Sequence, residues 1–249
     1  MRMLTPLAAA SAASLALGAC GDTATESRVD EDLVNDDVAL LAADAIAEDL
    51  EVMNSLLTVM GVASAPVAFN VMDHSRSRTV EFFDGEGNLQ SAFDPITTAS
   101  IHTVLVVSGD VTRDGLEWSM DRTRDMWVTG LEGRETERTW NGTGTDDRTR
   151  ARVTAAGESR SYDITGTLQV EDVIRGVPRA EFPWPLSGTI TRDLTIDVTN
   201  GPNGDETITR LVVLTFDGTR YPTLTVNGVE YEVDLAATGR DRVHRHMGH

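Results

Sequence analysis

The chain has 249 residues, with 40 acidic and 21 basic side chains and a formal net charge of −19 at pH 7. This excess of negative charge disfavours binding to nucleic acid, or to anionic lipid, through net charge. Cys20 is the single cysteine, which excludes a disulfide within the chain, so the fold must depend on burial and hydrogen bonding.

Residues 1–20 have the layout of a secretory signal. Arg2 supplies a positive start, an Ala-rich apolar run extends from Leu4 to Leu17, and small residues precede Cys20. This run is shorter than the about 20 apolar residues that a membrane-spanning helix needs.

The segment Leu17-Gly18-Ala19-Cys20 resembles the lipobox of bacterial lipoproteins. The resemblance implies that Leu17, Gly18 and Ala19 are recognition residues for processing. It also implies that the Cys20 thiol receives a diacylglyceryl group, and that a signal peptidase cuts before Cys20, whose new amine is then acylated. We therefore expect residues 1–19 to be a signal peptide and the lipid on Cys20 to hold the protein at a membrane.

The residue after the cysteine bears on the destination of a lipoprotein. In the enteric version of the family, an aspartate at that position favours retention in the inner membrane. Gly21 stands here, so the resemblance implies the outer membrane, with the domain facing the periplasm or the cell surface. An ordinary secretory signal with a chance cysteine is the alternative.

A flexible acidic tether and then a helix are predicted after the signal. Residues 20–35 are polar and acidic, which is typical of a solvated tether. Residues 36–60 have helical periodicity, and Gly61 is placed to end the helix. The predicted buried face consists of Leu40, Ala47, Leu50, Met53, Leu57 and Met60. The predicted opposite face carries Asp44, Glu48 and Glu51.

Beyond residue 66 the chain alternates in the manner of half-buried antiparallel strands. In the pattern from Gly188 to Thr199, the apolar side chains share a face with Arg192. Asn227-Gly228 is a strong signal for a two-residue hairpin. The ranges predicted as strands are 78–84, 88–94, 99–113, 115–131, 136–154, 159–174, 188–199, 206–217, 220–226 and 229–235.

These elements predict a mainly β fold in which residues 36–240 form one domain. No helical pattern separates the strands, which argues against a parallel α/β fold. Glycines within the strand patterns, such as Gly144 and Gly188, indicate bulges or bends. We predict a long curved antiparallel sheet, open or half-barrel, with one amphipathic N-terminal helix against its concave face. A two-layer β-sandwich is the alternative, and residues 241–249 are predicted to be a disordered His/Arg tail.

The histidines are weak candidates for chemistry. His244, His246 and His249 could chelate a metal, but a frayed solvated tail is the favoured interpretation. His74 and His102 lack the Ser and Asp partners of a catalytic motif, and we expect His102 to be a hydrogen-bonded residue on a strand face.

Arginines and tryptophans offer possible binding groups. Arg148, Arg150 and Arg152 share one strand face, and Arg122 and Arg124 form a similar pair. These side chains could grip phosphate or carboxylate groups, but solvated ion pairs with neighbouring strands are favoured. The four tryptophans could stack on sugars, although packing roles are commoner. They are Trp118, Trp127, Trp140 and Trp184.

No catalytic constellation is recognised, so the sequence predicts a noncatalytic lipoprotein that needs no cofactor and acts by binding an envelope protein or a surface. The alternative is a carrier that holds a lipid or other apolar ligand in the concave sheet. A carrier needs an apolar cavity of about 300–1,000 Å³. We expect Ile190, Leu194, Val212 and Leu214 to fill that volume instead.

Overall fold

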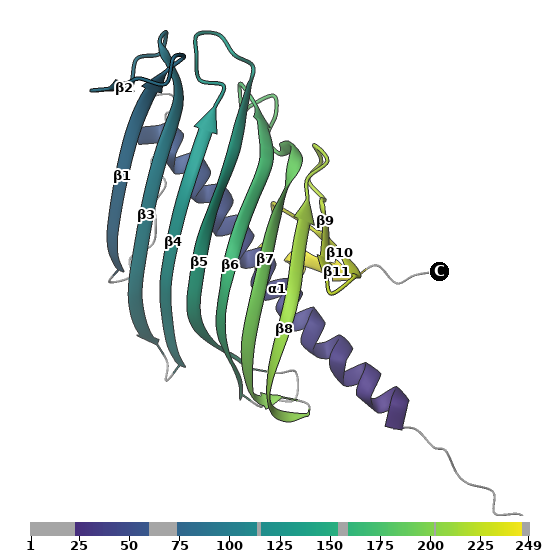
Figure 1. The fold of residues 1–249 in the computed structure, drawn as a ribbon. Coiled ribbons are helices and arrows are strands. Elements are labelled where there is room, and N and C mark those ends of the chain that lie inside the picture. Colours follow the sequence, from purple (N-terminus) through teal and green to yellow (C-terminus); the bar gives the residue numbers. More distant parts are fainter. Residues whose placement is uncertain (1–22, 60–73, 114–115, 154–158, 202, 246–249) are drawn as a thin grey trace, which may run out of the picture.

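The computed structural model describes residues 23–59, 74–113, 116–153, 159–201 and 203–245. Within these ranges, eleven strands form one sheet in the order β11-β10-β9-β8-β7-β6-β5-β4-β3-β1-β2 (Figure 1). Neighbouring strands pair antiparallel, and the sheet is not closed into a barrel. The predicted curved antiparallel sheet is therefore confirmed in its open form, as a single sheet and not a two-layer sandwich.

The element bounds are close to those expected from the alternation of apolar and polar residues. The elements are α1 (Thr23–Val59), β1 (His74–Asp84), β2 (Leu89–Gln90), β3 (Thr98–Arg113), β4 (Leu116–Thr129), β5 (Glu137–Val153), β6 (Ser159–Gly176), β7 (Pro185–Gly201), β8 (Gly204–Thr215), β9 (Thr223–Val226), β10 (Val229–Val233), the short 3₁₀ helix η1 (Gly239–Arg242) and β11 (Val243–Arg245).

The strand predicted at 88–94 is much shorter in the structure. Only Leu89–Gln90 pairs with β1, because the following segment turns back on itself. The Asp94 carboxylate accepts a hydrogen bond from the Ile96 backbone N–H at 2.8 Å, and the Thr98 N–H donates to the Asp94 carbonyl at 2.9 Å. Such local bonds compete with strand pairing.

The alternation in β7 is the one that the sequence predicts. Ile190, Arg192 and Leu194 are buried, whereas Asp193 and Thr195 are exposed. The Asn227-Gly228 hairpin is also confirmed, since Asn227 has φ 46°, Gly228 has φ 83°, and Val226 pairs with Val229. Positive φ at both central residues is what a type I′ turn requires.

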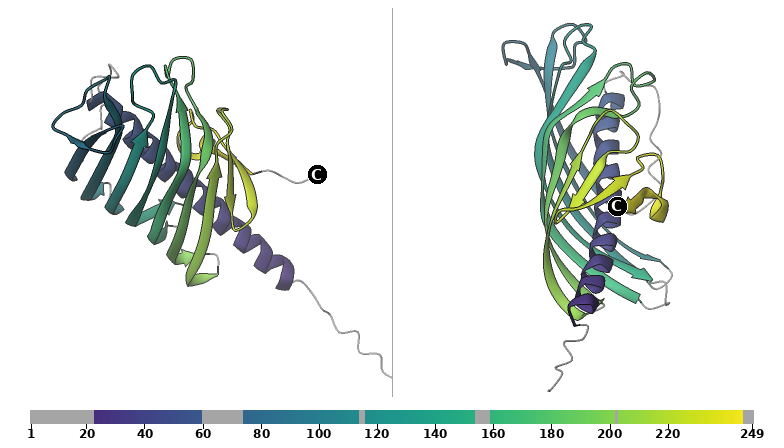
Figure 2. Two further views of the ribbon diagram at one scale, coloured as in Figure 1. Left: turned by 45° about the horizontal axis from the view of Figure 1, so that its top comes forward. Right: turned by 90° about the vertical axis from the view of Figure 1, so that its right-hand side faces the viewer.

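The helix α1 lies along the concave face of the sheet (Figure 2). It begins at Thr23, so the prediction of a flexible tether over residues 20–35 is wrong from Thr23 onward. Residues 20–22 lie outside the described ranges. Residues 23–35 contain no glycine or proline, and their polar side chains are compatible with a helix even without an apolar stripe. No helix in the described part of the chain has the length and hydropathy to cross a membrane.

The predicted apolar face of the helix is only partly correct. Leu50 and Met53 are buried, but Leu40 and Ala47 are half-buried, and Leu57 and Met60 lie outside the described side chains. The helix is buried over much of its circumference because the sheet covers one side and the C-terminal elements contact another. Its further buried side chains include Val38, Ala39, Leu41, Ala42, Ala45, Ile46 and Asp49.

The C-terminal segment is ordered further than predicted. η1 and β11 occupy residues 239–245, so the prediction of a disordered tail from 241 is wrong up to 245. β11 pairs with β10, and Nη1 of Arg242 donates a hydrogen bond to the Ala43 carbonyl at 3.2 Å. The segment therefore binds both the edge of the sheet and the helix.

Gly144 on β5 leaves room for the Arg124 side chain to lie flat on the sheet. A Cβ at this position would lie 2.5 Å from the Thr123 carbonyl oxygen and 2.8 Å from Nη1 of Arg124. That guanidinium donates to the Thr123 and Thr145 carbonyls at 2.7 and 3.0 Å.

We predict that Gly144→Ala lowers the free energy of unfolding by about 1–3 kcal/mol, because the backbone must shift to admit the methyl group. Urea unfolding followed by circular dichroism measures this change. Gly85→Ala is the matched control, since a Cβ there has its nearest contact at 3.6 Å with the Glu132 side chain. Equal destabilisation by both substitutions would contradict this account of Gly144.

Candidate functional site

A network of charged side chains lies between α1 and the concave face of the sheet. We call it the inner ion-pair network. It consists of Glu48 and Asp49 on α1, Arg122 and Arg124 on β4, Asp146 and Arg148 on β5, and Arg192 on β7. All of these residues except Glu48 are buried.

Asp49 and Asp146 each accept hydrogen bonds from several arginines. Nε of Arg124 donates to Asp49 at 2.8 Å, and Nη2 of Arg192 donates to the other oxygen of the same carboxylate. Asp146 receives Nη1 of Arg192 at 2.6 Å, Nη2 of Arg124 at 2.9 Å and Nε of Arg122 at 3.0 Å. Charged hydrogen bonds of this kind are the strong ones.

The electrostatics of the network keep both aspartates ionised. Burial alone would raise the pKa of Asp49, but the nearby charges of Arg124, Arg192 and Arg122 hold it below its usual range. The pKa of Asp146 is also lowered, because the attraction of Arg192 and Arg124 exceeds the effect of burial. Burial also disfavours the charged form of Arg124, and because this side chain is a base, its pKa is lowered.

The sequence prediction for these arginines was correct about ion pairing but wrong about solvation. Arg122, Arg124 and Arg148 are buried, because even-numbered residues of β4 and β5 point toward α1. Asp121 and Asp147 lie on the opposite, exposed face and do not join the network. Sequence reasoning missed Asp49, whose only available signal was a charge within an apolar helical stretch.

Further polar contacts fasten α1 along its length. Nε of Arg210 donates to the Asn35 side chain at 2.7 Å, and the Tyr162 hydroxyl donates to Asp37 at 2.5 Å. Burial and the neighbouring Asp37 raise the pKa of Tyr162. The helix is therefore held to the sheet by paired polar groups as well as by apolar packing.

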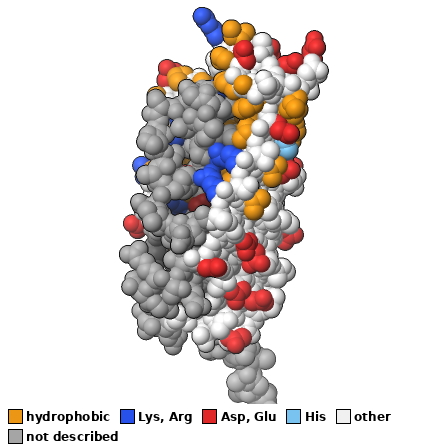
Figure 3. All heavy atoms as spheres, turned by 90° about the vertical axis from the view of Figure 1, so that its left-hand side faces the viewer, with side chains coloured by type: hydrophobic (Ala, Val, Ile, Leu, Met, Phe, Trp, Pro, Cys, Tyr) orange, Lys and Arg blue, Asp and Glu red, His pale blue; other side chains and the backbone are white. Residues whose placement is uncertain are grey.

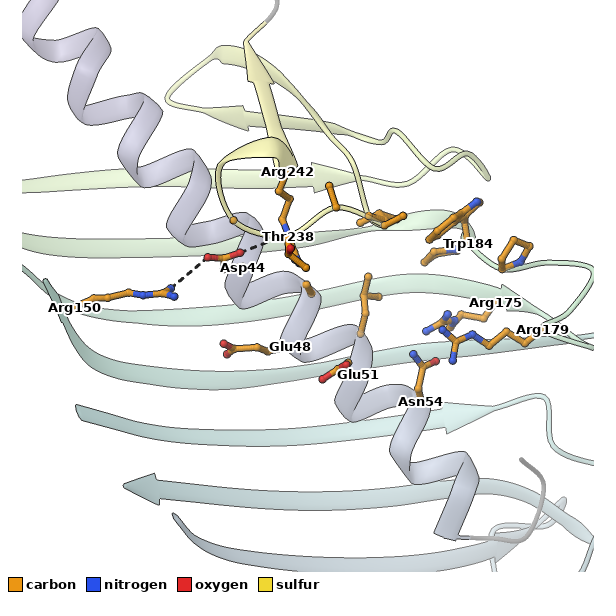
Figure 4. Close-up of a pocket in the computed structure, with 18 residues that line it drawn as sticks. Asp44, Glu48, Glu51, Asn54, Arg150, Arg175, Arg179, Trp184, Thr238 and Arg242 are labelled. Atoms are coloured by element: carbon orange, nitrogen blue, oxygen red, sulfur yellow. Dashed lines mark ion pairs between the residues drawn. The ribbon is translucent and has the colours of Figure 1, made fainter. Parts of the chain in front are cut away.

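A cleft of about 520 Å³ opens between α1, the β6–β7 connection and the segment after β10 (Figure 4). At one end Asp44 pairs with Arg150 and Arg242, each at 3.5 Å. At the other end Arg175 and Arg179 lie together with Trp184 and Asn54. This volume lies within the usual range of small-molecule sites.

A β-bulge turns Arg175 toward the cleft. The pairing of β6 shifts between Val170 and Val173 relative to β5, and between Glu171 and Ile174 relative to β7, so that β6 carries one extra residue there. An extra residue inverts the alternation of side chains, and Val173 and Arg175 consequently point inward like Val170. Gly188 on β7 has φ 102°, and a Cβ there would lie 2.3 Å from the Asp172 carbonyl oxygen.

The centre of the concave face is filled by side chains. Ile190, Leu194, Val212 and Leu214 belong to one buried hydrophobic cluster together with α1, as expected. Smaller cavities beside this core, such as the one next to Trp140 and the one next to Ile164, hold about 10 Å³ each.

His102 on β3 lies on a strand face, as expected, with carboxylates on both sides. Its Nδ1 is 3.0 Å from Glu81 and its Nε2 is 2.8 Å from Asp125. The imidazole stacks on Trp127 with 4.6 Å between ring centroids, and Phe83 contacts the same indole. Figure 3 shows the β1 side of the molecule, where hydrophobic side chains gather toward one end and acidic side chains are spread over the rest.

The remaining candidates are not brought together. Trp140 is buried in the core, whereas Trp184 is half-buried at the cleft. His244 is exposed on β11. The lipobox residues Leu17, Gly18, Ala19 and Cys20 lie outside the described residues, as do His246, His249 and the side chains of His74, Trp118 and Arg152.

Comparisons of the chain with protein families, with curated proteins and with solved structures found no match.

We predict that Asp49→Ala lowers the free energy of unfolding by about 3–5 kcal/mol, because it removes one of the two buried carboxylates that pair with the buried arginines. Urea unfolding of the full chain measures the loss. Glu51→Ala is the control on the next residue of the same helix, because Glu51 is exposed and should change stability by less than about 0.5 kcal/mol. Similar values for the two variants would contradict a stabilising role of the network.

We predict that the pKa of His102 in the folded protein lies above its usual value of 6.5. Burial lowers this pKa, but the hydrogen bonds to Glu81 and Asp125 and the negative charge of these carboxylates raise it by more than burial lowers it. Only the protonated ring can donate to both carboxylates. The stabilisation is therefore complete below pH 6.5 and is lost as the pH rises through the folded-state pKa.

An NMR titration of the imidazole C–H signals measures the pKa of His102. Asp125→Asn should lower it, whereas Asp121→Asn should not, because Asp121 lies opposite Ser108 on the same strand pair. A pKa at or below 6.5 in the unsubstituted protein would contradict the paired arrangement.

Proposed function

We propose that this protein is a noncatalytic lipoprotein of the bacterial cell envelope, anchored by lipid on Cys20, whose β-rich domain acts by binding. The observation that carries the anchor is the apolar run that ends in Leu17-Gly18-Ala19-Cys20. The proposed location is the outer membrane, with the domain facing the periplasm or the cell surface. The proposed partner is an envelope protein or surface component.

The start of α1 supports this arrangement. Thr23, its first residue, follows Cys20 closely in the sequence, and the N-terminal part of the helix projects beyond the edge of the sheet (Figure 1). A lipid on Cys20 would therefore hold the helix by its free end. The inner ion-pair network then fastens the other part of the helix to the sheet.

The use of buried charges supports a noncatalytic role. Asp49 and Asp146 are committed to arginines that hold α1 in place, so these carboxylates serve packing and not proton transfer. The filled concave face favours a binding module over a carrier of an apolar ligand, since Ile190 and Val212 occupy the space that a carrier would leave empty.

We predict that Cys20→Ser releases the folded domain from the membrane, because a hydroxyl cannot replace the thiol that accepts the lipid. Cell fractionation followed by immunoblotting measures the partition between membrane and periplasmic fractions. A variant that stays in the membrane fraction would contradict the anchor.

Gly21→Asp is the matched control, because it changes the neighbouring residue and keeps Cys20. It should remain in the membrane fraction and shift toward the inner membrane where the enteric rule applies. Mass spectrometry of the natively produced protein is the direct check, and an unmodified Cys20 would overturn the proposal.

A further inference from the structure

The cleft end formed by Arg175, Arg179 and Trp184 has positive charge that no described carboxylate neutralises. Arg175 is only 7% exposed, and its buried Nη1 has no hydrogen-bond partner among the described residues. No ion pair joins Arg175 or Arg179 to an acid within the described part of the chain. A buried donor without a partner is costly, and it needs an explanation in a folded protein.

Burial and Arg179 decide the electrostatics of Arg175. Arg138 stands opposite Arg175 in the β5–β6 pairing, but it does not line the cleft, and its charged neighbour is Glu135. Burial, with a smaller effect of the neighbouring Arg179, lowers the pKa of Arg175 to about 10, so this side chain is still cationic at neutral pH.

The acidic residues of the cleft do not compensate these arginines. Asp44 pairs with Arg150 and Arg242, and Glu48 pairs with Arg122 at 2.5 Å. Glu51 is exposed, and Figure 4 shows its carboxylate turned away from the two guanidinium groups, which lie side by side and face α1. The cleft is therefore divided into a neutralised end and a cationic end.

We propose that the cationic end of this cleft binds a phosphate group, with Arg175 and Arg179 as the donors and Trp184 against the body of the ligand. Guanidinium groups donate two parallel hydrogen bonds to phosphate oxygens. A phosphate monoester carries about −1.5 to −2 charges at pH 7, which balances two arginines better than one carboxylate does. An aromatic side chain beside the anion offers a packing surface for an apolar or ring-shaped remainder.

This inference names a ligand for the proposed binding role, but it does not require lipid on Cys20. Calorimetry tests the ligand and fractionation tests the anchor, so either can fail alone. The same phosphate chemistry can come from a lipid headgroup or from a soluble phosphate ester, and the choice of probes separates these sources.

Isothermal titration calorimetry of the full chain in detergent micelles tests the site. The probes are phenyl phosphate, benzoate of similar size, and dihexanoyl phosphatidic acid. Phenyl phosphate should bind with one site per chain and about tenfold more tightly than benzoate. Tighter binding of the phosphatidic acid than of phenyl phosphate would identify a lipid headgroup as the source, and the reverse order would identify a soluble ester.

Arg175→Met should weaken phenyl phosphate binding at least about tenfold, because it removes charged hydrogen bonds to the phosphate. It should leave the thermal midpoint unchanged or higher, since it removes an unpaired buried charge. Arg179→Gln, at an exposed position, should also weaken binding. Arg134→Gln, at an exposed position in the β4–β5 connection, makes the same change in net charge outside the cleft and should leave binding unchanged.

Three results would overturn the proposal. They are no measurable binding of either phosphate probe, benzoate binding as tight as phenyl phosphate, and equal affinity of the Arg179→Gln variant and the unsubstituted protein. A fourth result, unchanged affinity of Arg175→Met, would also overturn it, and a fall in the thermal midpoint of that variant would then assign Arg175 a structural role.

Discussion

The buried ion pairs between α1 and the sheet are the constraint on which the rest of the structure depends. Asp49 and Asp146 share the guanidinium groups of Arg124 and Arg192. The inner face of α1 and the concave face of the sheet therefore need each other in order to be buried. A buried charge that loses its partner is far less stable than one exposed to water. The helix must therefore dock in one position along its axis, because a shift by one residue would remove Asp49 from both arginines. Gly144 contributes by leaving space for Arg124 to lie across β5.

The docked helix fills the concave side of the sheet. The sheet bows around α1, and its last strands with η1 extend along another side of the helix (Figure 2). The apolar side chains of β7 and β8 pack against the helix at the centre, which leaves little empty volume there.

The larger space lies at the margin, where η1, the β6–β7 connection and α1 meet without filling the gap. The bulge in β6 turns Arg175 into that space. The strongest candidate for ligand binding therefore lies beside the core and not within it.

The proposed anchor gives the helix a second role. In a lipoprotein with lipid on Cys20, α1 would connect the membrane to the sheet. A force on the anchor would then act on the hydrogen bond between Tyr162 and Asp37 and on the ion pairs of Asp49. Paired polar groups along a helix resist displacement along its axis better than apolar contacts alone, since each pair has a defined geometry. The outer face of the sheet, which carries Asp193 and Thr195, is exposed to solvent.

By itself, the sequence determined the β-rich class, the bounds of the long strands, the Asn227-Gly228 hairpin and the inward position of Arg192 in β7. These features follow from local alternation and turn chemistry, which neighbouring residues specify. Only the tertiary structure decided that Asp49 is buried, that residues 243–245 form a strand, and that Arg175 faces a cleft. Each of these features depends on contacts between segments far apart in the chain, or on a bulge that inverts the alternation. The physical reason is that a charged side chain can be buried only where the fold places an opposite charge beside it, and that charge comes from a distant part of the sequence.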